Sequence, residues 1–194
     1  MLNPLKPHHV ATDPIKGLPS IAKVVDHIKG SSRDTALFTL GTNLAFRASD
    51  LLSLNLGDVR GLRVGDVLRL KEKKTGNQRS VTVNAKVVQA LAPLLQLRAG
   101  EADDAPLFVG LKRKTRLTVE TLGRLVKCWC TAVGLNGNYS SHSLRKTFGY
   151  TLRTEHKLPL EIIQKLYGHS SGAITLNYVS IQADELHDAY MLGI

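Results

Sequence analysis

Long apolar runs are missing from this sequence of 194 residues, and its first twenty residues contain no apolar segment typical of a signal peptide. A membrane-spanning helix needs roughly 18 consecutive apolar residues, and a secretory leader needs a shorter apolar centre. The sequence therefore predicts neither a membrane protein nor a secreted one. We expect a cytoplasmic protein with no membrane partner.

Cysteine is nearly absent, with two residues in the whole chain. Cys128 and Cys130 fall within a predicted helix, where a separation of two residues turns their side chains about 200° apart. They cannot share a metal ion in that arrangement, and it does not suit a disulfide between them. We interpret both as packing residues, as buried free cysteines usually are. No convincing metal-binding cluster is present, and we expect no cofactor.

Aromatic and acidic residues are also scarce. Aromatic residues make up 5% of the chain, and 26 lysines and arginines against 16 acidic residues give a formal net charge of +10. Such a charge predicts a polyanionic partner, most simply nucleic acid, and the few aromatic residues argue against stacking on unpaired bases. The basic residues are spread as on a folded surface that meets a backbone at several phosphates: 69–79, 111–116, 144–146 and 152–157. We therefore expect double-stranded DNA as the partner and an association with the nucleoid.

The chain is long enough for one domain with its own core. Residues 1–19 hold four of the seven prolines and no apolar period, so we expect a flexible N-terminal arm before a domain over residues 20–194. Alternating segments at 67–73 and 79–84 predict a β-hairpin around Lys-Thr-Gly-Asn. Other segments predict helices, one of them kinked or ended early by Pro93: 21–29, 33–46, 85–98, 119–133, 140–150, 158–168, 169–179 and 181–192. The predicted fold class is mainly α with a small antiparallel β-sheet (α+β).

Five scattered side chains are suited to holding a phosphodiester. A pentacoordinate phosphorus transition state carries negative charge on its non-bridging oxygens, and fixed cationic donors stabilise it. Arginine donates two parallel hydrogen bonds and keeps its charge, whereas histidine can also move a proton near neutral pH. Two of the five stand one helical turn apart, where they repel mildly and could share one phosphate. The five are Arg47, Lys74, His142, Arg145 and His169.

A tyrosine, Tyr178, follows His169 by nine residues. The ordinary pKa of its hydroxyl is about 10, but neighbouring arginines favour the deprotonated form, which can attack phosphorus. The departing 5′-oxygen then needs a proton, and Lys74 at the predicted hairpin tip is placed to give one. Each residue alone also has an ordinary interpretation: Arg47 as a core arginine paired to Asp50, His169 as a turn or cap residue, and Tyr178 as a core tyrosine.

Taken in order, five segments resemble the tyrosine recombinase (phage integrase) family. The family pattern is Arg-x-Ser-Glu/Asp, a lysine in a β-hairpin, His-x-x-Arg, Leu-Gly-His and a tyrosine about nine residues later. The resemblance covers about residues 20–183, and its segments read FRASDLLSLNLGDV, KKTGNQRSVTV, HSLRKTF, LYGHSS and LNYVS. It implies the tyrosine recombinase catalytic-domain fold. It also implies a metal-independent, site-specific recombinase that cleaves and rejoins duplex DNA.

The resemblance implies a role for each matching residue. Arg47 and Arg145 would clamp the scissile phosphate. His142 would hydrogen-bond the same phosphate and assist proton transfer, and His169 would donate to a non-bridging oxygen. Asp50 matches the acidic position that orients the site from behind.

The remaining two roles concern bond breaking. Tyr178 would be the nucleophile that forms a 3′-phosphotyrosine, and Lys74 the general acid. Lys73 and Lys71 are rivals for that acid, and we prefer Lys74 because it directly precedes Thr-Gly. One departure is Tyr167, which stands where leucine is usual before Gly-His.

A larger departure is the short segment before the predicted catalytic domain. Most family members carry a helical core-binding domain there, and we expect it to be absent from this chain. The chain is then either an excised catalytic domain or a short single-domain member similar to the fimbrial inverting recombinases. We expect self-association on DNA as a dimer or tetramer. Two other functions remain open: DNA relaxation like that of type IB topoisomerases, and a non-catalytic DNA-binding accessory role.

Overall fold

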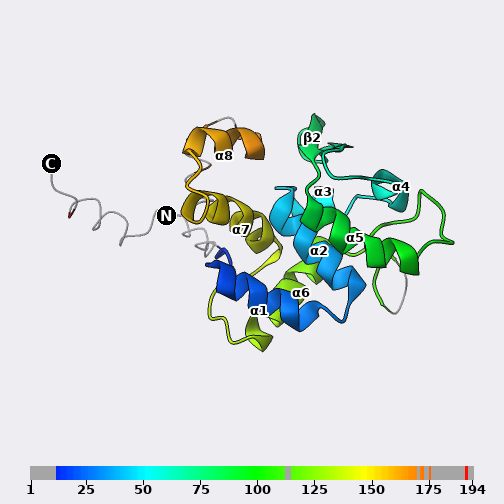
Figure 1. Cartoon of the computed structure of the whole chain (residues 1–194), viewed down its shortest axis with the longest axis horizontal. Coiled ribbons are helices and arrows are strands. Elements are labelled where there is room, and N and C mark those ends of the chain that lie inside the picture. Colours follow the sequence, from blue (N-terminus) through cyan, green and yellow to red (C-terminus); the bar gives the residue numbers. More distant parts are fainter. Residues whose placement is uncertain (1–11, 112–114, 170, 173–174, 176–190, 192–194) are drawn as a thin grey trace, which may run out of the picture.

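The computed structural model describes residues 12–111, 115–169, 171–172, 175 and 191, and the structural statements below concern these residues. Within them the chain forms eight helices and one two-stranded antiparallel sheet (Figure 1). The predicted class, mainly α with a small antiparallel sheet, is confirmed. The elements are α1 Leu18–Ile28, α2 Ser32–Asn43, α3 Ala48–Leu51, α4 Leu56–Val59, β1 Val67–Lys71, β2 Gln78–Thr82, α5 Ala85–Leu97, α6 Val119–Ala132, α7 Ser141–Thr154 and α8 Leu160–Tyr167.

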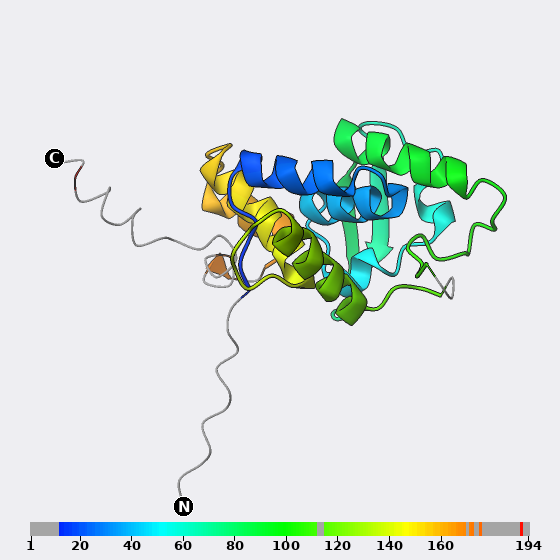
Figure 2. The same cartoon turned by 90° about the horizontal axis from the view of Figure 1, so that it is seen from below.

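Helix α2 is the centre of the main core. It packs against α5 on one side and α7 on the other, and α6 lies against α7 (Figure 2). Phe38 of α2 meets Trp129 of α6 edge-on, with ring centroids 6.1 Å apart. A Cβ on Gly41 would lie 2.6 Å from a methyl carbon of Leu144, so α2 and α7 touch where glycine removes the side chain. This contact sets the position of α7 against α2, and α7 carries His142 and Arg145, two of the predicted site residues.

The hairpin has one buried face and one exposed face. Strands β1 and β2 pair with Leu68 opposite Val81 and Leu70 opposite Arg79. Successive side chains of a strand point to opposite faces, so Leu68, Leu70 and Glu72 share the inner side. Arg79 lies on that same side with Val81. The inner face of the hairpin therefore ends, near the turn, in one acidic residue, Glu72, and one basic residue, Arg79.

Helix caps explain most of the boundaries. Asn84, Thr118 and Ser140 each accept a hydrogen bond from a backbone N–H in the first turn of α5, α6 and α7. The predicted early end at Pro93 is wrong, because α5 continues to Leu97. Pro93 lies on the exposed face of α5, where water can satisfy the carbonyl that loses its helical partner.

The segment before α1 is packed over its described part. Ile15 is fully buried, and its N–H donates to the hydroxyl of Thr147 on α7 at 2.8 Å. Asp13 exchanges hydrogen bonds with Asn138. Residues 12–17, which we expected to belong to a flexible arm, are thus anchored to the domain by one apolar side chain; residues 1–11 lie outside the described part. No helix within the described ranges is long and apolar enough to cross a membrane.

A second, smaller core joins α8 to α7. Ile163 and Tyr167 of α8 are fully buried with Ala45, and Phe148 of α7 packs against them. Gly168 then ends α8 in the left-handed conformation, with φ of 66°. Two predicted helices, 169–179 and 181–192, fall largely outside the described residues. His169, which follows the end of α8, thus lies beside Arg145 of α7.

Candidate active site

A strained turn between α2 and α3 places Arg47. Ala45 is buried and has a φ of 54°, which is uncommon for a residue other than glycine. Such a conformation persists where surrounding packing enforces it. Arg47 then takes the N-cap position of α3 in extended geometry, and its side chain is 23% exposed.

Two carboxylates surround Arg47. Its Nη1 lies 2.6 Å from Oε1 of Glu72 and 3.8 Å from Oδ2 of Asp50. Asp50 is fully buried and accepts the backbone N–H of Lys73 at 2.9 Å. The pairing of Arg47 with Asp50 therefore exists, but Glu72 is the nearer partner. Asp50 fastens α3 to the base of the hairpin turn.

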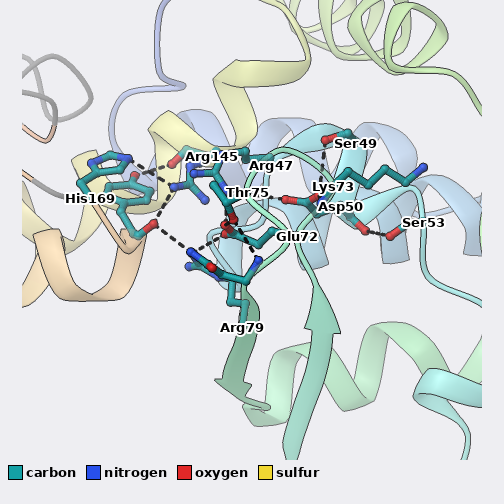
Figure 3. A network of polar contacts seen from close by, with 12 residues as sticks. Arg47, Ser49, Asp50, Ser53, Glu72, Lys73, Thr75, Arg79, Arg145 and His169 are labelled. Carbon is teal, nitrogen blue, oxygen red and sulfur yellow. Dashed lines mark hydrogen bonds and ion pairs between the residues drawn. The ribbon is translucent and has the colours of Figure 1, made fainter.

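Glu72 is the central acceptor of the cluster (Figure 3). Besides Arg47, its carboxylate accepts the hydroxyl of Thr75 at 2.7 Å and lies 3.4 Å from Nη1 of Arg79. Burial raises the pKa of Glu72, but hydrogen bonds from Arg47 and Thr75 and the charges of both arginines outweigh burial. The net pKa lies below the ordinary value, so Glu72 is ionised at neutral pH.

Arg79 belongs to the cluster, although from the sequence we expected it only as part of a strand. Its guanidinium donates to the carbonyl of Tyr167 at 2.9 Å and to that of Leu166, in the last turn of α8. Burial lowers the pKa of Arg79, and Glu72 opposes that effect. Arg79 and Val81 are two residues apart on β2, so they share the apolar face of an alternating strand. An arginine at such a position is the signal that could have identified it.

Arg145 enters the cluster from α7 and is 2% exposed. Its Nη2 donates to the carbonyl of Tyr167 at 3.0 Å and lies 3.3 Å from Nε2 of His169. The guanidinium carbon sits 4.5 Å from the ring centroid of Tyr167, within cation–π range. Arg145 is thus fixed against the segment that ends α8.

His169 stacks on Tyr167, with ring centroids 4.8 Å apart and an interplanar angle of 14°. Its Nε2 faces Arg145, which has only donors, so Nε2 accepts and the ring proton is on Nδ1. Nδ1 then donates to the hydroxyl of Thr175 at 3.0 Å. Burial, followed by the charges of three arginines, lowers the pKa of His169 to about 4. The imidazole is neutral at physiological pH.

Of the remaining predicted residues, two are exposed and one lies outside the described part. His142 is exposed, one turn before Arg145, and partial desolvation and two neighbouring cations lower its pKa. Lys74 is exposed on the hairpin turn, while the Lys73 side chain extends away from Arg145 and His169 (Figure 3). Tyr178 lies outside the described residues.

The structure thus brings three of the six predicted catalytic residues into one polar cluster, namely Arg47, Arg145 and His169. They come from the α2–α3 turn, α7 and the end of α8, and the hairpin joins them through Glu72 and Arg79. Three guanidinium groups face one another with Glu72 and Asp50 as the neighbouring carboxylates. The positive excess suits an anion with several acceptor oxygens. No cluster of described residues has the composition to hold a metal ion.

The chain is similar in sequence to known recombinases. The model of the phage integrase family matches residues 16–185. Tyrosine recombinase XerC of Caldanaerobacter subterraneus subsp. tengcongensis is 30% identical over 172 residues, which cover 86% of this chain and 47% of XerC. The probable integrase/recombinase YoeC of Bacillus subtilis is 30% identical over 178 residues, covering 91% of this chain and 94% of YoeC. The chain therefore spans about half the length of that XerC and nearly all of YoeC.

Solved structures share the fold. XerA recombinase superposes with a TM-score of 0.77 at 21% identity, covering 93% of this chain and 65% of XerA. XerH recombinase bound to its difH substrate gives a TM-score of 0.75 at 21% identity, covering 94% of this chain and 54% of XerH. From the family match over most of its length, the chain belongs to the phage integrase family, the tyrosine recombinases.

Proposed function

We propose that this chain cleaves and rejoins duplex DNA at specific sites, through a covalent 3′-phosphotyrosine intermediate. The observation that carries the proposal is the convergence of Arg47, Arg145 and His169 from three distant segments onto one polar cluster. A phosphodiester transition state needs such a set of fixed donors. Residues 20–194 form the catalytic domain in this proposal.

Arg47 and Arg145 bind the non-bridging oxygens of the scissile phosphate. Arg145 is already fixed by the Tyr167 carbonyl, so little conformational freedom is lost on binding. Arg47 is held by Glu72 and keeps part of its side chain exposed to an incoming phosphate. His142, at the exposed edge of the cluster, reaches the same phosphate from the first turn of α7.

His169 donates to a non-bridging oxygen after it gains a second proton. In the free chain its Nε2 accepts from Arg145, and its low pKa keeps it neutral. A bound phosphate brings negative charge next to the ring, and nearby negative charge raises the pKa of a histidine. Phosphate binding and protonation of Nε2 are therefore coupled.

Tyr178 is the nucleophile and Lys74 the general acid in this proposal. Tyr178 attacks phosphorus as its phenolate, which neighbouring arginines favour and which has lost its proton to solvent. The bond from phosphorus to the 5′-oxygen breaks, and that oxygen takes a proton from Lys74, so the 3′-phosphate remains on the tyrosine. Lys74 is supported by its exposure on a turn whose base Asp50 and Glu72 fasten to the cluster. Tyr178 is supported by its spacing of nine residues from His169.

Double-stranded DNA is the proposed substrate, bound by copies of the chain that associate on it. XerH was solved bound to difH, and lambda integrase as a dimer bound to a core site. The net charge of +10 supports the same class of partner for this chain. Self-association on DNA would supply the second strand end that recombination requires.

The test is the capture of a covalent adduct. The chain is incubated with a pool of nicked duplexes whose flanks are randomised, so that cleavage releases a short fragment and traps the protein on DNA. Denaturing gels then report the adduct, and sequencing of trapped DNA reports the site. We expect an adduct in the wild type and none in Tyr178→Phe, with DNA binding unchanged. An adduct that survives in Tyr178→Phe would remove Tyr178 as the nucleophile.

The same experiment separates the alternatives. A topoisomerase relaxes supercoiled plasmid that lacks the selected site, whereas a recombinase joins the trapped strand to a second duplex carrying that site. A DNA-binding accessory protein binds without forming any adduct. Strand transfer dependent on the selected sequence is the result we expect.

A further inference from the structure

The hydroxyl of Tyr167 is inserted beside the backbone of α7 at the turn that carries Arg145. It donates to the carbonyl of Arg145 at 2.5 Å and accepts the N–H of Gly149 at 2.8 Å. These two backbone groups are the i and i+4 partners of one helical turn. A side chain that bridges them fixes the position of that turn relative to α8. It therefore also fixes the point where the Arg145 side chain leaves the helix.

The ring and the backbone of Tyr167 contact the same two site residues. The ring stacks on His169 at 4.8 Å, and its face lies 4.5 Å from the guanidinium carbon of Arg145. The Tyr167 carbonyl accepts Nη2 of Arg145 at 3.0 Å. One fully buried residue thus contacts the main chain and side chain of Arg145 and the ring of His169.

Gly149 leaves the space that the tyrosine fills. A Cβ on Gly149 would lie 2.2 Å from the Tyr167 hydroxyl and 2.7 and 2.8 Å from two ring carbons. Glycine inside a helix is less favourable than alanine, so its presence here needs a local reason. Glycine at this helical position and tyrosine at position 167 are therefore sterically matched. Leucine, the usual residue before Gly-His, has neither a hydroxyl nor an aromatic face for these contacts.

We propose that Tyr167 is a positioning residue that orients Arg145 and His169 for phosphate binding, with Gly149 as its structural complement. The proposal rests on the proposed function of this site. An ordinary core tyrosine would contribute packing alone, whereas this one sets the orientation of two groups that meet the phosphate. It follows that the hydroxyl and the ring have separable effects.

The first experiment measures the site without DNA. NMR spectra of the histidine side chains, assigned with His169→Gln, report the His169 ring in wild type, Tyr167→Phe and Tyr167→Leu. A ring stacked on tyrosine has upfield-shifted protons. We expect that shift to persist in Tyr167→Phe and to disappear in Tyr167→Leu. The charges that face His169 are those of Arg145, Arg47, Arg79 and Glu72, and all remain in each variant.

The titration of His169 gives a second readout from the same samples. We expect its pKa to rise from about 4 towards 6.5 in Tyr167→Leu, because loss of the ring admits water to the imidazole. Tyr139→Phe is the matched control, since the hydroxyl of Tyr139 also donates to a backbone carbonyl but lies outside the cluster. That variant should leave the His169 signals and titration as they are in the wild type.

The second experiment measures cleavage of the selected nicked duplex at saturating protein, below the melting temperature of each variant. We expect a loss of about 10-fold in Tyr167→Phe and about 100-fold in Tyr167→Leu, because small displacements of phosphate-binding groups slow the reaction strongly. Gly149→Ala should be damaging in the wild-type background. It should be tolerated when combined with Tyr167→Leu, since the leucine leaves room for the added methyl. Tyr139→Phe should cleave like the wild type.

The outcomes separate this proposal from the proposed function. If folded Tyr167→Leu keeps the wild-type His169 shift and titration, or keeps the wild-type cleavage rate, the positioning role of Tyr167 is wrong. If the wild type forms no adduct, the proposed function fails, while the NMR experiment still decides whether Tyr167 orients His169. Equal damage by Gly149→Ala beside tyrosine and beside leucine would overturn the matched pair.

Discussion

At the scale of single residues, the surroundings of His169 determine its protonation state. Burial is the largest cause of its low pKa, and the charges of Arg145, Arg47 and Arg79 add to it. An imidazole that is neutral in the free chain accepts from Arg145, and it can become a donor when an anion arrives. In the proposed function the residue is therefore an acceptor in the free chain and a donor once the phosphate is bound.

A first prediction concerns stability and pH. The folded chain protonates His169 at about pH 4, while an unfolded chain does so at about 6.5. Between these values the unfolded chain binds more protons, so the free energy of unfolding decreases as the pH is lowered through this window. Urea unfolding should show this decrease to be larger in wild type than in His169→Gln, by about 1–3 kcal/mol. Identical pH dependence in the two proteins would contradict the low pKa.

A second prediction concerns Lys74. If Lys74 protonates the leaving 5′-oxygen, Lys74→Ala should bind DNA normally and cleave about 10²–10⁴-fold more slowly. A substrate with a 5′-bridging sulfur hardly needs that proton, so cleavage by the variant should return close to the wild-type rate. Arg145→Ala is the control, because lost charge stabilisation affects both substrates. Rescue of Lys73→Ala in place of Lys74→Ala would move the general acid by one residue.

At the scale of elements, the hairpin connects parts of the site that lie far apart in the sequence. Its turn is bound to α3 through the carboxylate of Asp50, and Glu72 at its base pairs with Arg47. Arg79 on β2 donates to the last carbonyls of α8, just before His169. A cation at the C-terminal end of a helix satisfies carbonyls that have no helical partner. The hairpin therefore determines how the lysine turn and the His169 segment lie relative to each other.

A third prediction tests this connection. Arg79→Ala removes the donors to α8 and one partner of Glu72, and it should lower the free energy of unfolding by about 1–3 kcal/mol. It should also reduce cleavage by about 100-fold through displacement of the His169 segment. Arg69→Ala removes the same charge from the exposed face of the hairpin and should change neither quantity beyond a small loss of DNA affinity. Equal effects of the two substitutions would show that Arg79 acts through charge alone.

At the scale of the whole molecule, positive charge is the property that supports the proposed binding to DNA. The formal net charge is +10, and the basic segments come from distant parts of the chain. Each phosphate contact releases condensed counterions, so affinity for duplex falls as salt increases. This contribution does not depend on DNA sequence.

A fourth prediction follows from that charge. The logarithm of the binding constant for non-specific duplex should fall linearly with the logarithm of salt concentration, with a slope of about −0.9 per phosphate contact. Fluorescence anisotropy with a labelled duplex at increasing salt measures the slope. Tyr178→Phe should give the same slope as the wild type, because it removes no charge. A binding constant that does not change between low and moderate salt would contradict DNA as the partner.

Local features of the sequence determined much of the fold. The caps at Asn84, Thr118 and Ser140, the Gly168 that ends α8 and the alternation of the hairpin each depend on neighbours a few residues away. Patterns of that range predicted the class and most helix starts. They allowed an early end at Pro93, but α5 continues past it with the proline on the exposed face, where water can satisfy the freed carbonyl.

The sequence by itself also determined the family and the identities of Arg47, Arg145 and His169 as site candidates, because residue order and spacing are properties of the chain alone. Only the tertiary structure decided which residues these three side chains contact. Glu72 and Arg79 look like ordinary hairpin residues until β1, β2 and α8 come together. The hydroxyl of Tyr167 meets the helical turn of Arg145, 22 residues away in the sequence, because α8 packs on α7 through a separate small core. Burial and charge from distant segments set the pKa of His169, and no local pattern encodes either of them.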